Sequence, residues 1–341
     1  MKIYIYRDIF NDFSAFHQEA YDKNFHNLRT HLKWFNDLNE TLVKYEVKDP
    51  NEADYFYIPI CTLVFEFLNI DISPIIKKLE FIGQGRHILF VSGDYSHREK
   101  GTQECILPSR KYSKIYDWLD PQFILISVES TPSLLSTDIA IFPYQNEKIQ
   151  LKRNLLYVNS ANSSYSNKEP SRMESKLLYS FCGALSYGDH LPGGHIRGAG
   201  GIMNYAKAEP DCFIGSQQDA LRAFGYVDST YHSIMSRSTF TLCPAGYGRW
   251  SFRWIEALLC KSIPIIMSDG YTLPFGGYIN WSKYVIILKE DSLKSVDSIL
   301  REISPSEISS MQANIARDQH LFTKQNCHNL IVSELERLTQ F

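Results

Sequence analysis

The chain has 341 residues, of which 44% are hydrophobic, 21% are charged and 13% are aromatic, including 21 Tyr and 20 Phe. This composition is typical of a folded globular protein and excludes a disordered, collagen-like or low-complexity chain, while the length predicts two domains. Because 35 Lys and Arg stand against 38 Asp and Glu, for a net charge of -3, no broad basic surface is expected and no nucleic-acid partner is predicted.

The first half of the chain alternates between short apolar runs, bounded by turn residues, and longer amphipathic segments. Buried parallel strands are predicted at 2–6, 55–60, 87–92, 123–127 and 138–143. Helices are predicted between them at 25–38, 74–81 and 112–119. This alternation predicts a doubly wound α/β domain over residues 1–160, followed by a linker at 161–174 in a Ser/Asn-rich stretch.

The same alternation starts again in the second half. Strands are predicted at 176–182, 212–214, 240–243, 263–267 and 284–288. Helices are predicted at 219–224, 231–236, 251–260, 293–302 and 307–317, with a last helix at about 324–338. We therefore expect a second α/β domain over 175–323 and a C-terminal helix within 324–341, for which packing back on the first domain is one arrangement. Two doubly wound domains facing a cleft are the predicted architecture, with ligands beyond the carboxyl ends of the strands.

Several features of the sequence bear on where the protein works. The first seven residues lack the apolar segment of a signal peptide, and the most apolar stretch, 55–70, is interrupted by Pro59 and Glu66. Seven scattered cysteines without a CxxC pair are typical of free thiols in a reducing compartment. We expect a soluble cytoplasmic protein, and peripheral attachment to a membrane through a partner is left open.

Some common catalytic and cofactor motifs do not occur in the sequence. There is no GxxxxGK[ST] phosphate loop and no GxSxG elbow, and the glycine-rich run at 193–201 does not follow the GxGxxG pattern. There is also no Asp-x-Asp pair to hold a divalent ion against a diphosphate. Any bound phosphates are therefore expected to be held by arginines and helix N-termini.

The most informative segment is 238–281, in which a strand leads through the loop Pro-Ala-Gly-Tyr-Gly into a helix near Ser251. Gly246 allows the backbone to approach a ligand closely, and Ser251 is a natural helix cap. Arg253 falls in the first turn, where it could bind phosphate oxygens in a bidentate manner, and Glu256 follows on the same face. A carboxylate there could accept both hydroxyls of a ribose. The alternative interpretation is an Arg–Glu surface pair.

This segment resembles the exostosin family, glycosyltransferase family 47. The family signature runs from Pro-x-Gly through Ser-x-Arg-x-x-Glu-Ala to Leu-Pro-Phe and Ile-x-Trp. The matching residues are Pro244, Gly246, Ser251, Arg253, Glu256, Ala257, Pro264, Ile265, Ile266, Asp269, Leu273, Pro274, Phe275, Ile279 and Trp281. Weaker similarities include the segment 177–183, which looks like the family's Phe-x-Gly, and the downstream Arg197. Because no anchor is evident, a soluble bacterial or viral type fits better than a Golgi type.

The resemblance implies a GT-B fold and an inverting transfer from a UDP-sugar that requires no metal or other cofactor. It implies that Arg253, the Ser251 helix terminus and Arg197 stabilise the leaving UDP, and that Glu256 binds the ribose. Asp269 is a candidate for sugar hydroxyls, with a plain turn residue as the alternative. The general base is expected from the first domain, where Asp94, close to His97, is preferred over Asp8.

The implied function is a glycosyltransferase, whether hexosyl-, pentosyl- or glucuronosyltransferase, that extends a growing polysaccharide or glycan such as a capsule or O-antigen chain. Its partners would be a nucleotide sugar and an oligosaccharide or lipid-linked acceptor. A complex with another glycosyltransferase is a further option. Two alternatives stay open: a poorly active subunit that serves as the assembly partner of another glycosyltransferase, and a nucleotide-sugar hydrolase or phosphorylase.

Overall fold

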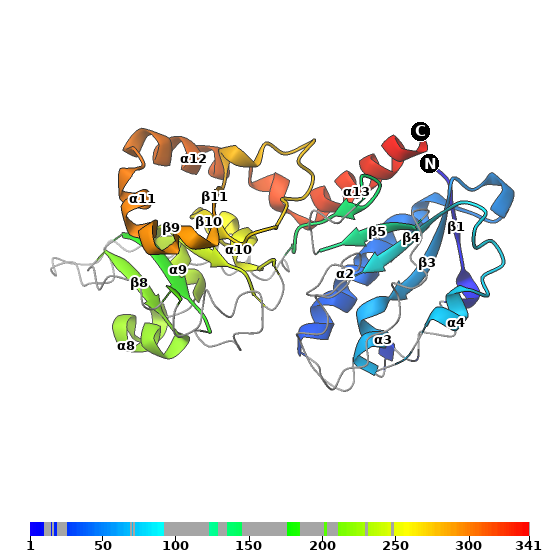
Figure 1. Cartoon of the computed structure of the whole chain (residues 1–341), viewed down its shortest axis with the longest axis horizontal. Helices are drawn as coiled ribbons and strands as arrows, with labels where there is room; N and C mark the ends of the chain where they lie inside the picture. The colour runs from blue at the N-terminus through cyan, green and yellow to red at the C-terminus, as the bar shows by residue number, and fades with distance from the viewer. Residues whose placement is uncertain are drawn as a thin grey trace. The chain divides into compact units, whose positions relative to one another are not determined.

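The computed structural model describes most of the chain in two compact units (Figure 1). The described residues are 1–9, 15, 17–18, 26–68, 70, 72–91, 123–128, 135–144, 176–184, 201–202, 211–228, 231–246 and 249–340. The first unit comprises Met1–Ile141, Tyr271–Phe275 and His328–Phe341, and the second comprises Phe142–Gly270 and Gly276–Cys327. The predicted helix at 112–119 and the predicted linker at 161–174 lie outside the described residues.

The first unit contains a parallel sheet with the strand order β2-β1-β3-β4-β5-β6. Its strands are β1 (Ile3–Ile5), β2 (Glu46–Val47), β3 (Tyr55–Cys61), β4 (Arg86–Val91), β5 (Phe123–Ser127) and β6 (Ile139–Ala140). The five strands predicted from the sequence are confirmed. The short edge strand β2 was not predicted, because two residues carry no recognisable period. Every residue of β3 and β5 is buried, which agrees with a parallel sheet covered on both faces.

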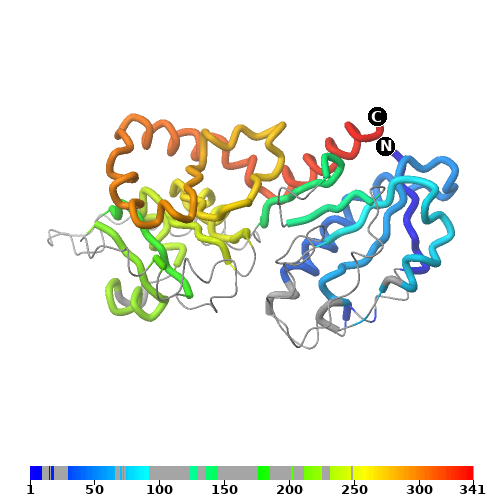
Figure 2. Tube along the Cα trace, viewed as in Figure 1, coloured from blue at the N-terminus to red at the C-terminus, as the bar shows by residue number. Residues whose placement is uncertain are grey.

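The alternation of side chains along β3 shows which helices cover one face of the first sheet. Tyr55 and Tyr57 point to one face, where the Tyr57 hydroxyl donates to the Asn39 side chain on α2 (His26–Leu42). On the same face, the Tyr55 hydroxyl donates to the Leu335 carbonyl oxygen on α13 (Lys324–Thr339), at 2.7 Å. The helices α2 and α13 therefore cover this face together, and both ends of the chain belong to the first unit (Figure 2).

In the first unit one helix was missed and one predicted helix ends early. The apolar stretch that begins at residue 55 holds a strand followed directly by the helix α3 (Thr62–Leu68), and an unbroken apolar run hides that change of period. The helix predicted at 74–81 ends early, because α4 covers only Ser73–Ile76. Turns follow it, in which the Leu79 N–H donates to the Ile76 carbonyl oxygen at 3.1 Å.

The second unit contains a parallel sheet with the order β11-β10-β9-β7-β8. Its strands are β7 (Leu177–Cys182), β8 (Cys212–Gly215), β9 (Ser238–Pro244), β10 (Ile263–Met267) and β11 (Ile286–Leu288), and all five were predicted. Its helices are α8 (Gln217–Asp228), α9 (Tyr231–Arg237), α10 (Arg253–Leu259), α11 (Val296–Glu302) and α12 (Pro305–Arg317). The described 3-10 segments of this unit are η4 (Trp281–Lys283), η5 (Glu290–Ser295) and η6 (Gln319–Phe322). Those of the first unit are η1 (Val43–Tyr45) and η2 (Pro50–Glu52).

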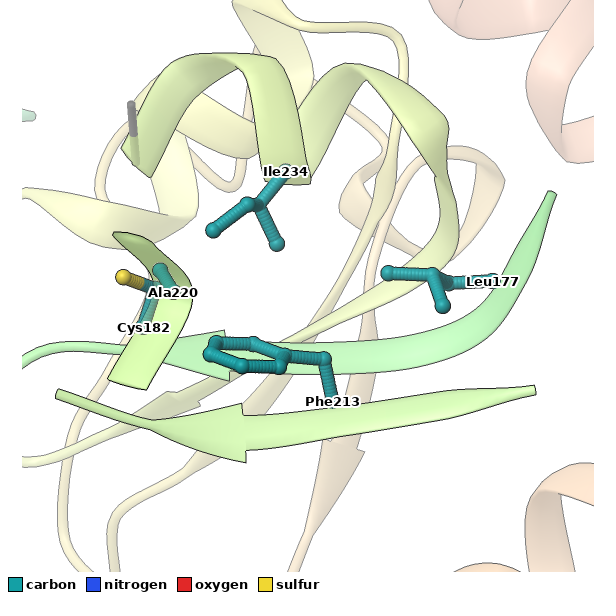
Figure 3. Packing of buried hydrophobic residues seen from close by; sticks show 5 residues of the cluster. All are labelled: Leu177, Cys182, Phe213, Ala220 and Ile234. Carbon is teal, nitrogen blue, oxygen red and sulfur yellow. The ribbon is translucent and has the colours of Figure 1, made fainter. Parts of the chain in front are cut away.

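One hydrophobic cluster of the second unit lies between α8, α9 and the strands β7 and β8. Ile234 of α9 points toward the strands that carry Leu177 and Phe213 (Figure 3). Ala220 and Cys182 close the cluster, and Phe224 and Tyr231 pack against it. Tyr231, the first residue of helix α9, therefore packs against a hydrophobic cluster.

In both sheets, the direction in which successive strands are added reverses once. In the second sheet the chain starts at β7, moves outward to β8, and then returns to the other side of β7 to form β9. Such a reversal leaves a crevice at the carboxyl ends of the two strands that diverge, which is where doubly wound proteins bind ligands. The predicted fold class, two successive Rossmann-like α/β units of the kind that GT-B proteins combine, is confirmed, with the C-terminal helix present.

Candidate functional site: a pocket at the end of β7

A pocket of about 500 Å³ opens at the carboxyl end of β7, next to the switch point of the second sheet. Its lining comes from the residues that end β7, from the start of α8, and from one residue each of α9 and α10. The lining residues are Cys182–Ala184, Ser216–Gln218, Tyr231 and Arg253. The topology of the sheet therefore brings together segments that are far apart in the sequence.

Helix α10 supplies the arginine of this pocket. All seven residues of the helix are buried, and Arg253 and Glu256 are its ionisable residues. Arg253 is only 8% exposed and Glu256 only 6%, so the alternative interpretation of a surface ion pair is wrong. Buried charges require specific partners, and Arg253 has them. Its Nη1 donates to the Cys182 carbonyl oxygen at 2.9 Å.

Two aromatic rings hold the Arg253 guanidinium. Its central carbon lies 4.3 Å from the centre of the Phe181 ring and 5.2 Å from the centre of the Tyr231 ring. Both distances are within the range of cation–π attraction, which strengthens when the cation is shielded from water. The guanidinium thus lines the pocket in an orientation set by two rings and a main-chain carbonyl.

Gly183 leaves the space that the guanidinium occupies. A Cβ atom at this position would lie 2.6 Å from Nη2 of Arg253, which is closer than any ordinary contact. Arg253 cannot move away easily, because the rings of Phe181 and Tyr231 hold it. A side chain at position 183 would therefore displace the guanidinium from this position.

Glu256 lies one helical turn after Arg253, beside His232 of α9. The distance between His232 Nε2 and Glu256 Oε1 is 3.9 Å. Burial raises the pKa of the Glu256 carboxyl to about 8, so at neutral pH the neutral acid predominates. His232 also makes an edge contact with the neighbouring Tyr231 ring, at 4.6 Å between centres. Residues 231 and 232 of α9 thus contact Arg253 and Glu256 of α10, respectively.

The start of α8 forms another wall of the pocket and is capped internally. The Ser216 hydroxyl accepts from the Asp219 N–H at 3.2 Å, while the Asp219 carboxylate accepts from the Ser216 N–H at 2.8 Å. This is a reciprocal cap of the capping-box type. The Cys182 thiol lies 3.9 Å from Oε1 of Gln217, so the end of β7 and the start of α8 meet at the pocket.

Of the predicted site residues that the structure describes, Arg253 lines the pocket, and Glu256, Ser251, Gly246 and Asp269 do not. Helix α10 begins at Arg253, its cap position is Phe252, and the Ser251 hydroxyl accepts only a long bond from the Arg253 N–H, at 3.4 Å. Gly246 is half-buried after β9. Asp269 is exposed, and its carboxylate accepts from the Glu290 N–H at 3.2 Å, in a turn where Gly270 has a φ of 76°.

Of the other predicted site residues, one lies among the described residues. Asp94, His97 and Arg197 lie outside the described residues, and Asp8 is exposed shortly after β1. Within the described ranges, no group of three His, Cys, Asp or Glu side chains could hold a metal ion. In the part of the chain that the structure covers, no helix is long and apolar enough to span a bilayer.

Of the eight residues that line the pocket, only Arg253 was predicted as a site residue from the sequence. Tyr231 and His232 were assigned only to a helix, because nothing in their spacing links them to residues more than 20 positions later. Gly183 belongs to the segment that looks like the Phe-x-Gly of the exostosin motif, and this was a usable signal. A glycine directly after a buried strand, in a doubly wound unit, marks a close approach at the ligand edge.

Comparison with known proteins gives one consistent match. Residues 1–303 match the exostosin GT47 domain. The chain is 26% identical over 285 residues to a probable glucuronosyltransferase 47 A of Physcomitrium patens, which covers 79% of this chain and 58% of that protein. It is 25% identical over 285 residues to the probable beta-1,4-xylosyltransferase IRX10L of Arabidopsis thaliana, covering 79% and 63%. The chain therefore spans about three fifths of the length of these curated relatives.

Among solved structures, the chain is similar to Anabaena HepE in complex with UDP. The sequence identity is 10% and the TM-score is 0.42, over 84% of this chain and 79% of that one.

Proposed function

The chain belongs to the exostosin GT47 family of glycosyltransferases, and on this premise we propose that it transfers a sugar from a UDP-sugar to a hydroxyl group of a growing polysaccharide or glycan. We propose that the transfer inverts the anomeric centre in a single displacement and needs no metal. In such a reaction the departing diphosphate must be stabilised by positive groups, and the acceptor hydroxyl must lose a proton.

The observation that carries the proposal is the fixed Arg253 guanidinium in a pocket at the switch point of the second sheet. A diphosphate carries the charge that a guanidinium binds best, through two parallel hydrogen bonds. The pocket volume of about 500 Å³ lies within the usual range for small-molecule sites. We propose that the β- and α-phosphates of UDP lie against Arg253, with the start of α8 nearby.

Other residues are assigned more specific roles in the same proposal. Glu256 is proposed to accept the ribose hydroxyls, which would favour its ionised form over the neutral acid that burial favours. Asp269 is proposed to contact hydroxyls of the donor sugar. Gly246, the Ser251 terminus and Arg197 are proposed to complete the diphosphate site. The general base is proposed to be Asp94.

The acceptor is proposed to be an oligosaccharide or a lipid-linked glycan, extended in the cytoplasm. The six cysteines that the structure describes are free thiols, which supports a reducing compartment. A complex with another glycosyltransferase, or attachment to the membrane through a partner, would bring the enzyme to a lipid-linked acceptor.

The test compares two arginines that both donate to a main-chain carbonyl. Arg253 donates to Cys182, and Arg86 of the first unit donates to Leu338. We expect Arg253→Ala to lower kcat/KM for the UDP-sugar by about a hundredfold, corresponding to about 2.7 kcal/mol of lost stabilisation. Arg86→Ala should change kcat/KM by no more than about twofold. UDP release would be measured with a panel of UDP-sugars and an oligosaccharide acceptor.

Different results would contradict different parts of the proposal. Equal activity of the Arg253→Ala variant and the wild type would show that Arg253 does not stabilise the leaving diphosphate. Release of free sugar or sugar phosphate at the same rate without acceptor would indicate a hydrolase or phosphorylase. UDP binding without turnover, on every donor and acceptor tried, would favour the poorly active assembly subunit.

A further inference from the structure

The Phe181 and Tyr231 rings, together with the Cys182 carbonyl oxygen, hold the Arg253 guanidinium, and we call this set of contacts the aromatic clamp. The ring centres lie 4.3 and 5.2 Å from the guanidinium carbon. Arginine has large rotamer freedom, and ligand binding normally has to restrict it. In the aromatic clamp this restriction is already present without a ligand, so binding does not have to order the side chain.

The two rings differ in what else they do. Phe181 is fully buried within β7, so its removal would disturb the sheet itself. Tyr231 is half-buried, packs against the cluster around Ile234 on one side, and lines the pocket. Tyr231 can therefore be changed with less damage to the fold, and it is the ring of the clamp that lines the pocket.

On these grounds we propose that Tyr231 is a positioning residue, which together with Gly183 fixes the Arg253 guanidinium in the pocket before a nucleoside diphosphate binds. The inference rests on the proposed function, since it assigns Arg253 to the diphosphate. Tyr231 acts through its ring face, so the hydroxyl group is dispensable. Gly183 acts by the absence of a Cβ atom, which would lie 2.6 Å from Nη2.

The second unit contains a matched control for this proposal. The Phe224 ring packs against the same hydrophobic cluster as Tyr231 and also carries a guanidinium, that of Arg237, at 4.5 Å from its centre. Phe224 is not among the residues that line the pocket. Replacing Phe224 by leucine therefore removes a comparable ring and a comparable cation contact without touching Arg253.

The first experiment measures UDP affinity by calorimetry for Tyr231→Leu, Tyr231→Phe and Phe224→Leu. We expect Tyr231→Leu to bind UDP about 10- to 30-fold more weakly, which is the effect of losing one shielded cation–π contact. Tyr231→Phe should stay within about twofold of the wild type, because it keeps the ring. Phe224→Leu should also stay within about twofold, although it lowers stability. Wild-type affinity of Tyr231→Leu, or an equal loss in Phe224→Leu, would overturn the proposal.

The second experiment separates positioning from direct binding by a double-mutant cycle. If Tyr231 acts through Arg253, then Tyr231→Leu should cause no further loss of affinity in an Arg253→Ala background. Additive losses would overturn the positioning role. Arg253→Ala with wild-type affinity would instead show that the proposed diphosphate site is wrong, so the two failures are distinguishable.

A spectroscopic measurement tests the clamp without any ligand. The Arg253 side-chain NMR signals, assigned by their loss in Arg253→Lys, should be shifted by the currents of the two rings. This shift should decrease in Tyr231→Leu and should be preserved in Tyr231→Phe and Phe224→Leu. For Gly183→Ala we expect displaced Arg253 signals and UDP binding weaker than that of Tyr231→Leu. Unchanged signals in Gly183→Ala and Tyr231→Leu would overturn the proposal.

Discussion

The first and second sheets arrange their strands in the same relative order around the switch strand, but they use aromatic rings for different purposes. In the first sheet, the rings of Tyr6 and Phe56 stack on His87, with centres 6.0 and 5.2 Å away. The imidazole is fully buried, its Nδ1 lies 3.0 Å from the Gly85 carbonyl oxygen, and the Tyr6 hydroxyl lies 3.1 Å from Nε2. Burial lowers the pKa of His87, which keeps the ring neutral.

In the second sheet, comparable rings enclose a group that cannot become neutral. Arg253 stays charged at every physiological pH, so the rings of Phe181 and Tyr231 stabilise a charge instead of completing a neutral core. The two sheets therefore share a strand order but differ in the charge of the group that the rings surround. Arg253 is a buried cation at the edge where β7 and β9 diverge, whereas Arg7, which follows β1 at the corresponding edge of the first sheet, is exposed and paired with Glu46. The following predictions test this contrast.

The largest effect is expected from the buried carboxyl of the second unit. The pKa of Glu256 is about 8 in the folded protein and near 4.5 in the unfolded chain, because burial favours the neutral acid. Between pH 4.5 and 8 the folded state holds a proton that the unfolded state has lost, so stability falls as pH rises. Glu256→Gln cannot ionise, so its stability relative to that of the wild type should rise by about 3 kcal/mol between pH 5.5 and pH 8.5. Urea unfolding at pH 5.5 and 8.5 measures this, and identical pH dependence in both proteins would contradict it.

A buried histidine of the first unit should give a smaller effect of opposite sign. His31 on α2 is buried beside Trp34, and burial lowers its pKa from 6.5 to about 4. Below pH 6.5 the unfolded chain takes up a proton that the folded state refuses, so stability falls as pH falls toward 4. This costs about 2 kcal/mol at pH 5 relative to pH 7.5. His31→Gln should reduce the acid dependence by that amount. Hydrogen exchange at pH 5 should show the change in the first unit, and a change confined to the second unit would contradict the assignment.

The smallest effect concerns two aspartates that both bond to main-chain N–H groups. Asp138 of the first unit accepts from Leu125 and Leu135, at 2.9 and 2.8 Å. Asp138→Ala should cost about 1 to 2 kcal/mol and leave the kinetics unchanged. Asp269→Ala should cost about 1 kcal/mol or less, and we expect it also to raise KM for the UDP-sugar severalfold with UDP affinity unchanged. If donor KM is also unchanged, Asp269 is a turn residue and nothing more.

The fold was predictable from the sequence because buried parallel strands are short apolar runs, and ten of these runs became strands. Helix α3 was missed because it continues the apolar run of β3 without a polar break. Arg253 and Glu256 could be selected from their spacing and the family motif. Their burial could not, since it follows from the packing of α10 against other elements on all sides. Tyr231 escaped prediction because strand β9 separates it from Arg253 in the sequence, and only the folded sheet brings the two together.

The helix α13 has a consequence for how this chain folds. The Tyr55 hydroxyl and the Leu335 carbonyl oxygen that join it to the first sheet are separated by 280 residues, and the second unit is encoded between them. The first unit therefore cannot be completed while the ribosome is still making the second, although domains usually fold as they emerge. During synthesis, the face of β3 that α13 covers stays exposed until α13 has been made. We expect the second unit to be the first to finish, and the nascent N-terminal unit to be the substrate of chaperones.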